Sequence, residues 1–217
     1  MQVWFRVAIQ AKYNKMQKLQ SDFYRREDVV QIARELIGKL LISRLSGQTV
    51  VARIVETEAY AGAADAASHA YRNRRTKRTE VLFAAGGTSY VYLCYGMHYL
   101  FNVVTGREGI PDAVLIRGVE PIEGGGKLSA GKGRQPGAGP AMVSRLMGIT
   151  LEQNGWNLVG NKLYLAEEKD TELPVAVSPR IGVDYAGGAA KWLYRLYVPD
   201  HPHVTPHKLN RKGIVLV

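Results

Sequence analysis

Hydrophobic residues repeat at helical spacing in the first forty positions of the chain. Between residues 27 and 37 they fall in adjacent pairs: Val29 with Val30, Ile32 with Ala33, and Leu36 with Ile37. This spacing places them on one face of a helix, and Gly38 is a residue at which helices commonly end. The pattern therefore predicts an amphipathic helix over residues 27–37.

After this helix the pattern changes to short apolar runs separated by turn residues, which is typical of strands. We predict strands over residues 39–45, 49–60, 88–95, 98–105, 113–118, 162–165, 180–183 and 192–198. Two further helices are predicted over residues 63–70 and 140–146, the second beginning at a proline that suits a first helical turn. Because the links between neighbouring strands are short, we expect a largely antiparallel sheet.

The chain has 217 residues, a length that suits one well-filled domain. Its first twenty residues are basic, with no acidic residue before Asp22 and with four cationic side chains: Arg6, Lys12, Lys15 and Lys18. They lack the apolar core and small-residue cleavage site of a secretory signal. We predict a basic N-terminal arm over residues 1–20 and a single domain over residues 21–217.

Two segments predict irregular structure. Residues 124–139 contain seven glycines together with Lys127, Lys132 and Arg134. We interpret them as a flexible surface loop, and a loop whose backbone contacts phosphate is the alternative. The tail from Pro199 onward is rich in proline and histidine, so we expect it to be irregular as well.

The composition indicates an anionic partner. The chain carries 29 Lys and Arg residues against 19 Asp and Glu residues, a formal net charge of +10. Such an excess favours a polyanion, although it is also compatible with a surface charge that only maintains solubility. No stretch is both long and apolar enough for a membrane span, so we expect no membrane association.

Cysteine and histidine usage limits the chemistry further. Cys94 is the only cysteine, which excludes an internal disulfide and fits a reducing compartment. It lies in an apolar run, so we expect a buried structural thiol. The five histidines show no zinc-ligand spacing, and we predict neither a metal nor an organic cofactor.

The strand over residues 49–60 ends in the candidate chemistry. Residues two apart in a strand share a face, so Glu56, Glu58 and Tyr60 are expected to point the same way. Two carboxylates about 6.5–7 Å apart could act as the acid/base pair of a glycosidase. The alternative is an exposed polar face with no chemical role.

Tyrosines are dense in the segment that follows, over residues 90–99. Tyr90 and Tyr92 share one strand face, and Tyr95 lies beside a turn at Gly96. Aromatic rings can hold a flat, electron-poor group, and a ring at a hairpin tip can wedge into a base stack. Sheet core is the alternative, since tyrosine is a common strand residue.

The order of these motifs is more specific than any one of them. Along the chain follow Glu-Thr-Glu-Ala-Tyr60, His69, Tyr-Val-Tyr-x-x-Tyr-Gly-Met97, Asn102, Leu-Ile-Arg117, Glu120-Pro121, Gly139-Pro140 and Pro-Arg-Ile-Gly-Val183. Taken together, this series closely resembles the alkyladenine (3-methyladenine) DNA glycosylases, over about residues 23–198. The resemblance implies an α+β fold, a single mixed domain whose curved, mainly antiparallel sheet is flanked by helices.

The resemblance also implies roles at matching positions. Glu58 corresponds to the general base that activates water, and Arg117 to an arginine near that water. The walls of the base pocket correspond to Tyr60, His69 and Tyr92, while Asn102 matches the residue that helps to exclude guanine. Tyr95 corresponds to the side chain that fills the gap left by a flipped nucleotide. Relative to some members of that family, a short insertion lies between Asn102 and Arg117, around residues 108–111.

The implied function is that of a monofunctional DNA glycosylase. Such an enzyme flips an alkylated or deaminated purine out of duplex DNA and hydrolyses its N-glycosidic bond, which starts base excision repair. Cations between the pocket segments are expected to contact phosphates: Arg72, Arg74, Arg75, Lys77 and Arg78. We expect a monomer that acts on double-stranded DNA, in the cytoplasm at the nucleoid of a prokaryote or in the nucleus of a eukaryote.

Two other function classes remain open at this point. A nucleic-acid binding module without catalysis would keep the basic surface and the tyrosines. A nucleoside-directed or RNA-directed hydrolase would use the Glu56 and Glu58 pair, although a small nucleoside needs neither a net charge of +10 nor a wedge tyrosine. Release of free base from a duplex with one damaged adenine separates the three.

Overall fold

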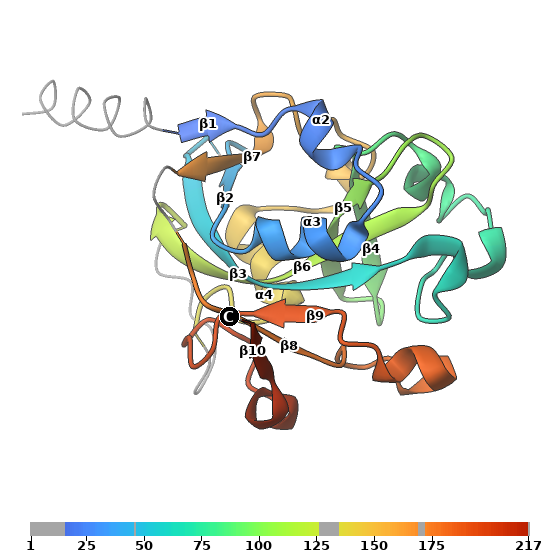
Figure 1. Cartoon of the computed structure of the whole chain (residues 1–217). Helices are drawn as coiled ribbons and strands as arrows, with labels where there is room; N and C mark the ends of the chain where they lie inside the picture. The colour runs from blue at the N-terminus through green and yellow to red at the C-terminus, as the bar shows by residue number, and fades with distance from the viewer. Residues whose placement is uncertain (1–15, 46, 126–134, 169–171, 217) are drawn as a thin grey trace, which may run out of the picture.

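The computed structural model describes residues 16–45, 47–125, 135–168 and 172–216 (Figure 1). Every strand pairing among them is antiparallel. The strands are β1 Met16–Lys18, β2 Leu40–Ser43, β3 Val50–Tyr60, β4 Ser89–Cys94, β5 His98–Thr105, β6 Asp112–Glu123, β7 Leu163–Glu168, β8 Val175–Ser178, β9 Arg195–Tyr197 and β10 Ile214–Leu216. The mixed architecture with a mainly antiparallel sheet confirms the predicted α+β fold class.

β3 is the centre of the sheet. The strand order is β1-β7-β2-β3-β6-β5-β4, and a branch of β9, β8 and β10 joins at β3. Two strands fit along one edge of β3 because β2 pairs with its residues 50–53 and β9 with its residues 56–58. On the other edge, the pairing with β6 shifts register on either side of Glu56. Such irregularities bend a strand and increase its twist. β3 accordingly curves around the core in Figure 1.

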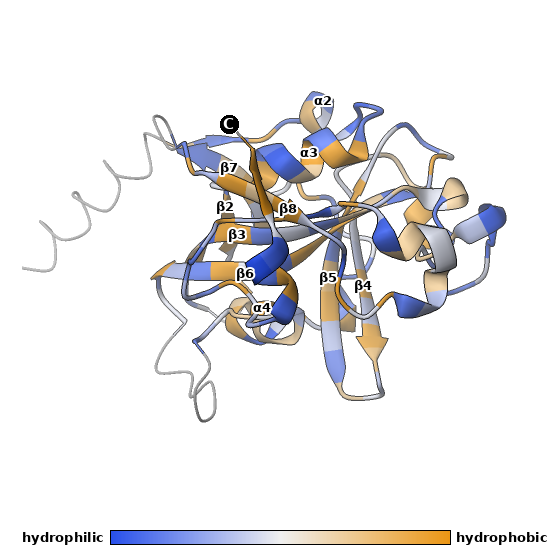
Figure 2. Ribbon diagram, turned by 60° about the horizontal axis from the view of Figure 1, so that its bottom comes forward, coloured by the Kyte–Doolittle hydropathy of each residue, from blue (hydrophilic) through white to orange (hydrophobic). Residues whose placement is uncertain are grey.

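The helices are α2 Ser21–Tyr24, α3 Val29–Leu36 and α4 Pro140–Met147. The side chain of Asp28 caps α3 by accepting from the backbone amides of Val30 and Gln31. The apolar side of α3 is buried on the sheet, and Figure 2 shows the helix banded in polar and apolar residues as this packing requires. Thr57 donates to the Ala33 carbonyl at 3.0 Å, so α3 covers the face of β3 that Thr57 occupies.

Short 3₁₀ turns connect many of these elements: Gly62–Ala64, Tyr71–Asn73, Glu80–Phe83, Leu151–Gln153, Asp184–Lys191 and Lys208–Lys212. The predicted helix over residues 63–70 is wrong, because only the first of these turns forms there. Asp65 explains the difference. Its carboxylate accepts from the amides of Ala61 and Ala67, and this local bonding competes with a helix.

Two further expectations need correction. Residues 180–183 form no strand, because Arg180 is drawn into a buried ion pair with Asp65 and the Ile181 amide donates to a glutamate. The strand just before them, β8, had not been predicted. The tail is also more regular than expected, since β10 at its end pairs with β8. The predicted strand over residues 113–118 is longer in the structure, as β6.

The predicted basic arm and the predicted glycine-rich loop each lie partly outside the described residues. Residues 126–134 of the predicted glycine-rich loop lie outside the described residues, as do residues 1–15 of the predicted basic arm. The last residues of that arm form β1, which pairs with β7. Within the described ranges, no helix is long and apolar enough to cross a membrane.

The β4–β5 hairpin carries the most exposed tyrosine of the site region. Both Tyr95, at φ 50°, and Gly96, at φ 71°, adopt left-handed backbone conformations at its tip. That conformation is routine for glycine and uncommon for tyrosine. It turns the ring outward, and Tyr95 is 89% exposed. The structure thus places an aromatic ring in solvent at some conformational cost.

Candidate active site

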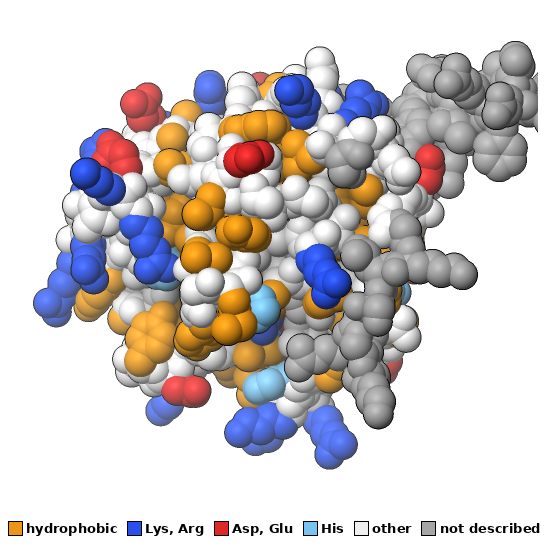
Figure 3. Space-filling view, turned by 180° about the vertical axis from the view of Figure 1, so that it is seen from behind, with side chains coloured by type: hydrophobic (Ala, Val, Ile, Leu, Met, Phe, Trp, Pro, Cys, Tyr) orange, Lys and Arg blue, Asp and Glu red, His pale blue; other side chains and the backbone are white. Residues whose placement is uncertain are grey.

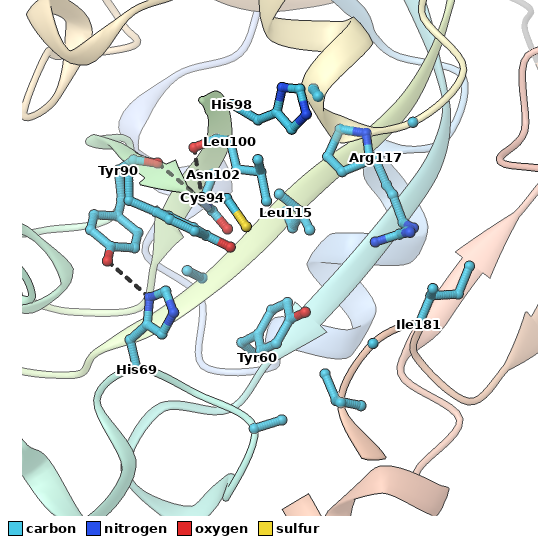
Figure 4. A pocket seen from close by; sticks show the side chains of 18 of the residues that line it. Tyr60, His69, Tyr90, Cys94, His98, Leu100, Asn102, Leu115, Arg117 and Ile181 are labelled. Atoms are coloured by element: carbon cyan, nitrogen blue, oxygen red, sulfur yellow. Dashed lines mark hydrogen bonds between the residues drawn. The ribbon is translucent and has the colours of Figure 1, made fainter. Parts of the chain in front are cut away.

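A cavity of about 680 Å³ opens where β3, β4, β5 and β6 meet the loop after β8. Figure 4 shows aromatic side chains on one side of it and Arg117 with Ile181 on the other. The sequence-predicted residues that line it are Tyr60, His69, Tyr92, Tyr95, Asn102 and Arg117. Segments distant in sequence therefore meet here, as the motif order predicted.

The aromatic wall is a packed cluster. The rings of His69 and Tyr92 meet edge to face at 4.7 Å, and Tyr90 lies 5.5 Å from Tyr92. His69 Nδ1 is 3.0 Å from the Tyr90 hydroxyl (Figure 4). Tyr90 was predicted to share the face of Tyr92 but had no assigned role, and the structure makes it the support of His69. The wall is thus rigid before any ligand enters.

The imidazole of His69 is neutral near pH 7. Burial, and secondarily the charges of Arg78 and Arg74, lower its pKa to about 4. The Arg78 guanidinium lies 3.4 Å from Nε2. Because arginine can only donate, Nε2 is the acceptor and Nδ1 carries the proton donated to Tyr90. The geometry therefore selects a single tautomer.

Asn102 lies in the floor of the cavity and is almost fully buried. Its side-chain nitrogen donates to the backbone carbonyls of Tyr90, at 3.1 Å, and Leu100, at 3.4 Å (Figure 4). The bond to Tyr90 joins β5 to β4, and the bond to Leu100 stays within β5. The side chain is therefore held in one place, as a residue that shapes a pocket must be.

Glu58 lies behind the cavity wall and is fully buried. Its Oε2 accepts from the Tyr60 hydroxyl at 2.9 Å and from Arg117 Nη1 at 3.3 Å. Its Oε1 accepts from the Ile181 amide at 2.8 Å. All three donors line the cavity, whereas Glu58 does not. A carboxylate offers about four acceptor sites, so one remains for a further donor such as water.

Glu56 is also fully buried, and it shares Arg117 with Glu58. The two carboxylates thus lie on one side of β3, as alternation predicted. Glu56 Oε1 accepts from Arg117 Nε at 3.1 Å and from Arg195 Nε at 2.7 Å, and Thr205 supplies two donors to Oε2. Four donors occupy its acceptor sites, so this geometry does not favour Glu56 as a proton-transfer group.

Arg117 is held by charge from both sides. Its side chain is 9% exposed and stands between Glu56 and Glu58. Burial by itself lowers the pKa of Arg117, but the charges of Glu58 and Glu56 outweigh it and the pKa rises. A buried guanidinium of this kind is permanently charged.

A second buried ion pair supports Tyr60. Both terminal nitrogens of Arg180 donate to the Asp65 carboxylate, and both side chains are fully buried. The guanidinium also lies over the Tyr60 ring, 4.7 Å from its centroid. Arg180 belongs to a segment that was included in the family resemblance without a role. No sequence signal connects it with Asp65, 115 residues away.

Cys94 does not lie where the sequence predicted. The expectation of a buried structural thiol is wrong, because Cys94 is half-buried and lines the cavity. Its neighbours Leu93 and Tyr95 are exposed, so the end of β4 is not covered by other elements. Among the described residues, no group of three His, Cys, Asp or Glu side chains is placed to hold a metal ion.

The predicted phosphate-contacting cations are all exposed: Arg72, Arg74, Arg75, Lys77 and Arg78. Arg75 pairs with Glu80 at 2.7 Å, and Arg78 lies over the Tyr92 ring at 5.1 Å. Figure 3 shows Lys and Arg side chains gathered along one edge of the face that it presents. Arg78 thereby links this charged segment to the cavity itself.

Known proteins are similar in sequence to this chain over most of its length. Residues 22–202 match the family model described as methylpurine-DNA glycosylase. A protein of Desulfitobacterium hafniense (strain Y51) is 42% identical over 202 residues, covering 88% of this chain and 99% of its own. One of Natranaerobius thermophilus is 41% identical over 196 residues, covering 87% and 98%. A third, of Borrelia garinii subsp. bavariensis, is 41% identical over 181 residues, covering 82% and 95%.

Each of these three relatives is provisionally named a 3-methyladenine DNA glycosylase. The family match extends from α2 to just beyond β9 and includes every site residue predicted from the motifs. The resemblance drawn from those motifs is thereby confirmed. The chain belongs to the methylpurine-DNA glycosylase family.

Proposed function

We propose that this protein is a monofunctional DNA glycosylase that removes alkylated or deaminated purines from duplex DNA and so begins base excision repair. Family membership supports the hydrolysis of N-glycosyl bonds. One observation carries the finer proposal. Tyr60 lines an aromatic cavity and also donates a hydrogen bond to the buried carboxylate of Glu58. The wall of the proposed nucleobase pocket is therefore in direct contact with the candidate general base.

The cavity suits a flipped purine. A base inside a duplex cannot reach an enzyme pocket, so its nucleotide rotates out at a cost of a few kcal/mol. The rings of Tyr60, His69 and Tyr92 then bracket the base, and each attracts a cationic alkylated purine by about 0.5–2 kcal/mol. Asn102 is fixed in the floor of the cavity, and we assign to it the exclusion of the extra amino group of guanine.

Glu58 acts on water in this proposal. Water attacks the anomeric carbon, its oxygen forms the new bond, and its proton passes to the Glu58 carboxylate. The N-glycosidic bond breaks and the base leaves with the electron pair. An alkylated cationic base leaves neutral without further help, whereas a neutral base such as hypoxanthine also requires a proton. Arg117, between the carboxylates, offsets the negative charge near the reacting water.

Water must reach a carboxylate that three pocket groups now cover. The Arg117 contact is the longest of the three, at 3.3 Å, and so it is the weakest barrier. A small movement of that guanidinium end frees an acceptor site on Glu58 Oε2, in addition to the site that the three donors leave open on Oε1.

Tyr95 and the exposed cations complete the proposal. The Tyr95 ring stands in solvent at the cavity rim, where it can fill the gap left by the extruded nucleotide. The basic segment around Arg74 and Lys77 holds the flanking phosphates. We expect one protein molecule to bind each lesion.

Incubation with duplexes that contain one methylated, deaminated or etheno-bridged adenine tests the proposal. Free base should be released without strand cleavage, and borohydride should trap no protein–DNA adduct, because water rather than lysine is the nucleophile. Binding without release would instead support a binding module. Release from free nucleosides alone would support a nucleoside hydrolase and contradict the proposal.

A further inference from the structure

Glu56 is fixed by the C-terminal segment of the chain as well as by the sheet. The Thr205 amide donates to Glu56 Oε2 at 2.8 Å, and the Thr205 hydroxyl donates to the same oxygen at 2.6 Å. Thr205 lies 149 residues from Glu56 and just beyond residue 202, where the family match ends. One residue outside that match therefore supplies half of the donors to a carboxylate inside it.

The segment around Thr205 is anchored on the same cluster. Asn210 accepts from Arg195 Nη2 at 2.9 Å and donates to the Thr205 carbonyl at 3.1 Å. The absence of a side chain at Gly118 lets the segment approach, since a Cβ there would lie 2.7 Å from the His203 carbonyl oxygen. Thr205 is thus placed by several contacts rather than by a loose tail.

The contacts continue from Thr205 to the proposed base. Glu56 Oε2 is held by Thr205, and its Oε1 holds Arg117 through Nε. The same guanidinium then reaches Glu58 through Nη1. We infer that Thr205 is a positioning residue for base excision, because it fixes Glu56 so that Glu56 orients Arg117 over Glu58.

The inference predicts a specific defect. Without the hydroxyl, Glu56 Oε2 keeps only one donor, and the carboxylate can rotate about its own axis. Arg117, bonded to its other oxygen, then shifts relative to Glu58. A displacement of about 1 Å in such a constellation can lower a rate by roughly 100-fold.

Thr205→Val and Thr205→Ser form the matched pair for the test, in the full-length chain. Valine preserves shape and removes the hydroxyl, whereas serine preserves the hydroxyl. Single-turnover base release is measured from pH 5 to 9, for each variant at saturating enzyme. We expect the rate of base release to fall roughly 10- to 100-fold in Thr205→Val and to remain close to wild type in Thr205→Ser.

A second measurement does not depend on activity. Nitrogen-detected NMR of arginine side chains reports how fast the Arg117 Nε proton exchanges with solvent. This proton forms the hydrogen bond that Glu56 accepts. We expect Thr205→Val to accelerate that exchange at least tenfold. The kinetic arm rests on the proposed function, and the NMR arm does not. If wild type releases no damaged base, the proposed function fails while the exchange comparison still decides the orientation of Arg117.

Several outcomes would overturn the inference. One is a Thr205→Val protein with wild-type rate, pH profile and proton exchange. Another is an equal loss in Thr205→Ser, which would show that the hydroxyl is not the active feature. A third is a loss that matches a lower melting temperature and fewer active molecules, without faster exchange of the Arg117 Nε proton, because that pattern indicates only a folding role.

Discussion

The Tyr60 hydroxyl donates a hydrogen bond of 2.9 Å to Glu58, so the wall of the cavity and its buried carboxylate form one unit. Burial, together with the charge of Glu58, raises the pKa of Tyr60 well above its usual value. The phenol therefore stays protonated and remains a donor throughout the working pH range. A nucleobase that stacks on Tyr60 would therefore contact a ring whose position is already fixed by its hydrogen bond to Glu58.

Glu58→Gln should keep lesion binding and lose most base release. The amide preserves the shape of the carboxylate but cannot accept the proton of water, and a general base is typically worth about 10²–10⁴-fold in rate. Single-turnover release and binding titration measure the two effects separately. Glu172→Gln, at an exposed position, is the control. A Glu58→Gln protein that turns over at nearly the wild-type rate would refute the assignment.

Tyr95→Ser should impair release from paired duplex more than from mismatched or single-stranded substrate. The ring is 89% exposed at the hairpin tip, so its removal should weaken the extruded state without opening the core. Tyr95→Phe retains the ring and should behave as wild type. Base release on paired and unpaired lesions, with the melting temperature of each variant, checks this. A uniform loss over all substrates with a lowered melting temperature would argue for a packing role instead.

Stability should depend on pH through two groups that act in opposite directions. Burial, and secondly the charges of Arg78 and Arg74, lower the pKa of His69 to about 4. The contribution of His69 to folding stability is therefore complete above about pH 6.5 and is lost as the pH falls toward 4. Burial, then Asp65, raises the pKa of Asp112 to about 6. The contribution of Asp112 to folding stability is complete below about pH 3.8 and is lost as the pH rises through 6.

Other groups with lowered pKa values, such as His201 and His207, also contribute in this window, so each variant is compared with wild type. Relative to wild type, the stability of His69→Gln should fall more as pH rises from 4 to 6.5, because the Asp112 effect is then unopposed by His69. Asp112→Asn should differ from wild type in the opposite direction. Urea unfolding at a series of pH values measures these slopes, and the slopes rather than the absolute stabilities carry the test. Identical slopes in all three proteins would contradict the assignment.

Asp65→Asn should be strongly destabilising. It leaves the fully buried guanidinium of Arg180 without its charge partner, and removal of one partner from a buried pair costs about 3–5 kcal/mol. Glu35→Gln breaks the partly exposed pair with Arg26 and should cost about 1 kcal/mol or less. Equilibrium denaturation of both variants gives the comparison. Equal small losses would mean that Arg180 finds other partners.

Salt should weaken binding to damaged and undamaged duplex alike. Removing one side chain that binds a phosphate should reduce the slope of log K against log salt by about 0.9. Arg74→Gln and Lys77→Gln should each lower that slope, because both exposed side chains lie in the basic segment beside the cavity. Arg34→Gln, on the helix that covers the other face of β3, should not. A flat titration of the wild type would show that the net charge does not serve DNA binding.

The local pattern of apolar and polar residues was sufficient to predict many of the helices and strands of this protein. The helical repeat predicted α3, and apolar runs predicted most strands of the sheet, because periodicity depends on which face of an element is buried. Strand alternation also placed Glu56 and Glu58 on one side of β3. The motif order indicated the family, since the same chemistry needs those side chains in one pocket. The predictions of elements and faces use residues that are neighbours or share one element, whereas the motif order uses residues spread over most of the chain.

Only the tertiary structure decided which charges are paired. Arg180 meets Asp65 across 115 residues, and Thr205 meets Glu56 across 149, and neither distance leaves a local trace in the sequence. The missing helix at residues 63–70 has a local cause instead, because Asp65 accepts from the amides of Ala61 and Ala67 and only the turn Gly62–Ala64 forms there. Buried charges require partners wherever the chain can supply them, because desolvation without a partner is too costly. The fold supplies those partners from distant segments, and it thereby determines which carboxylate of β3 has an acceptor site left for water.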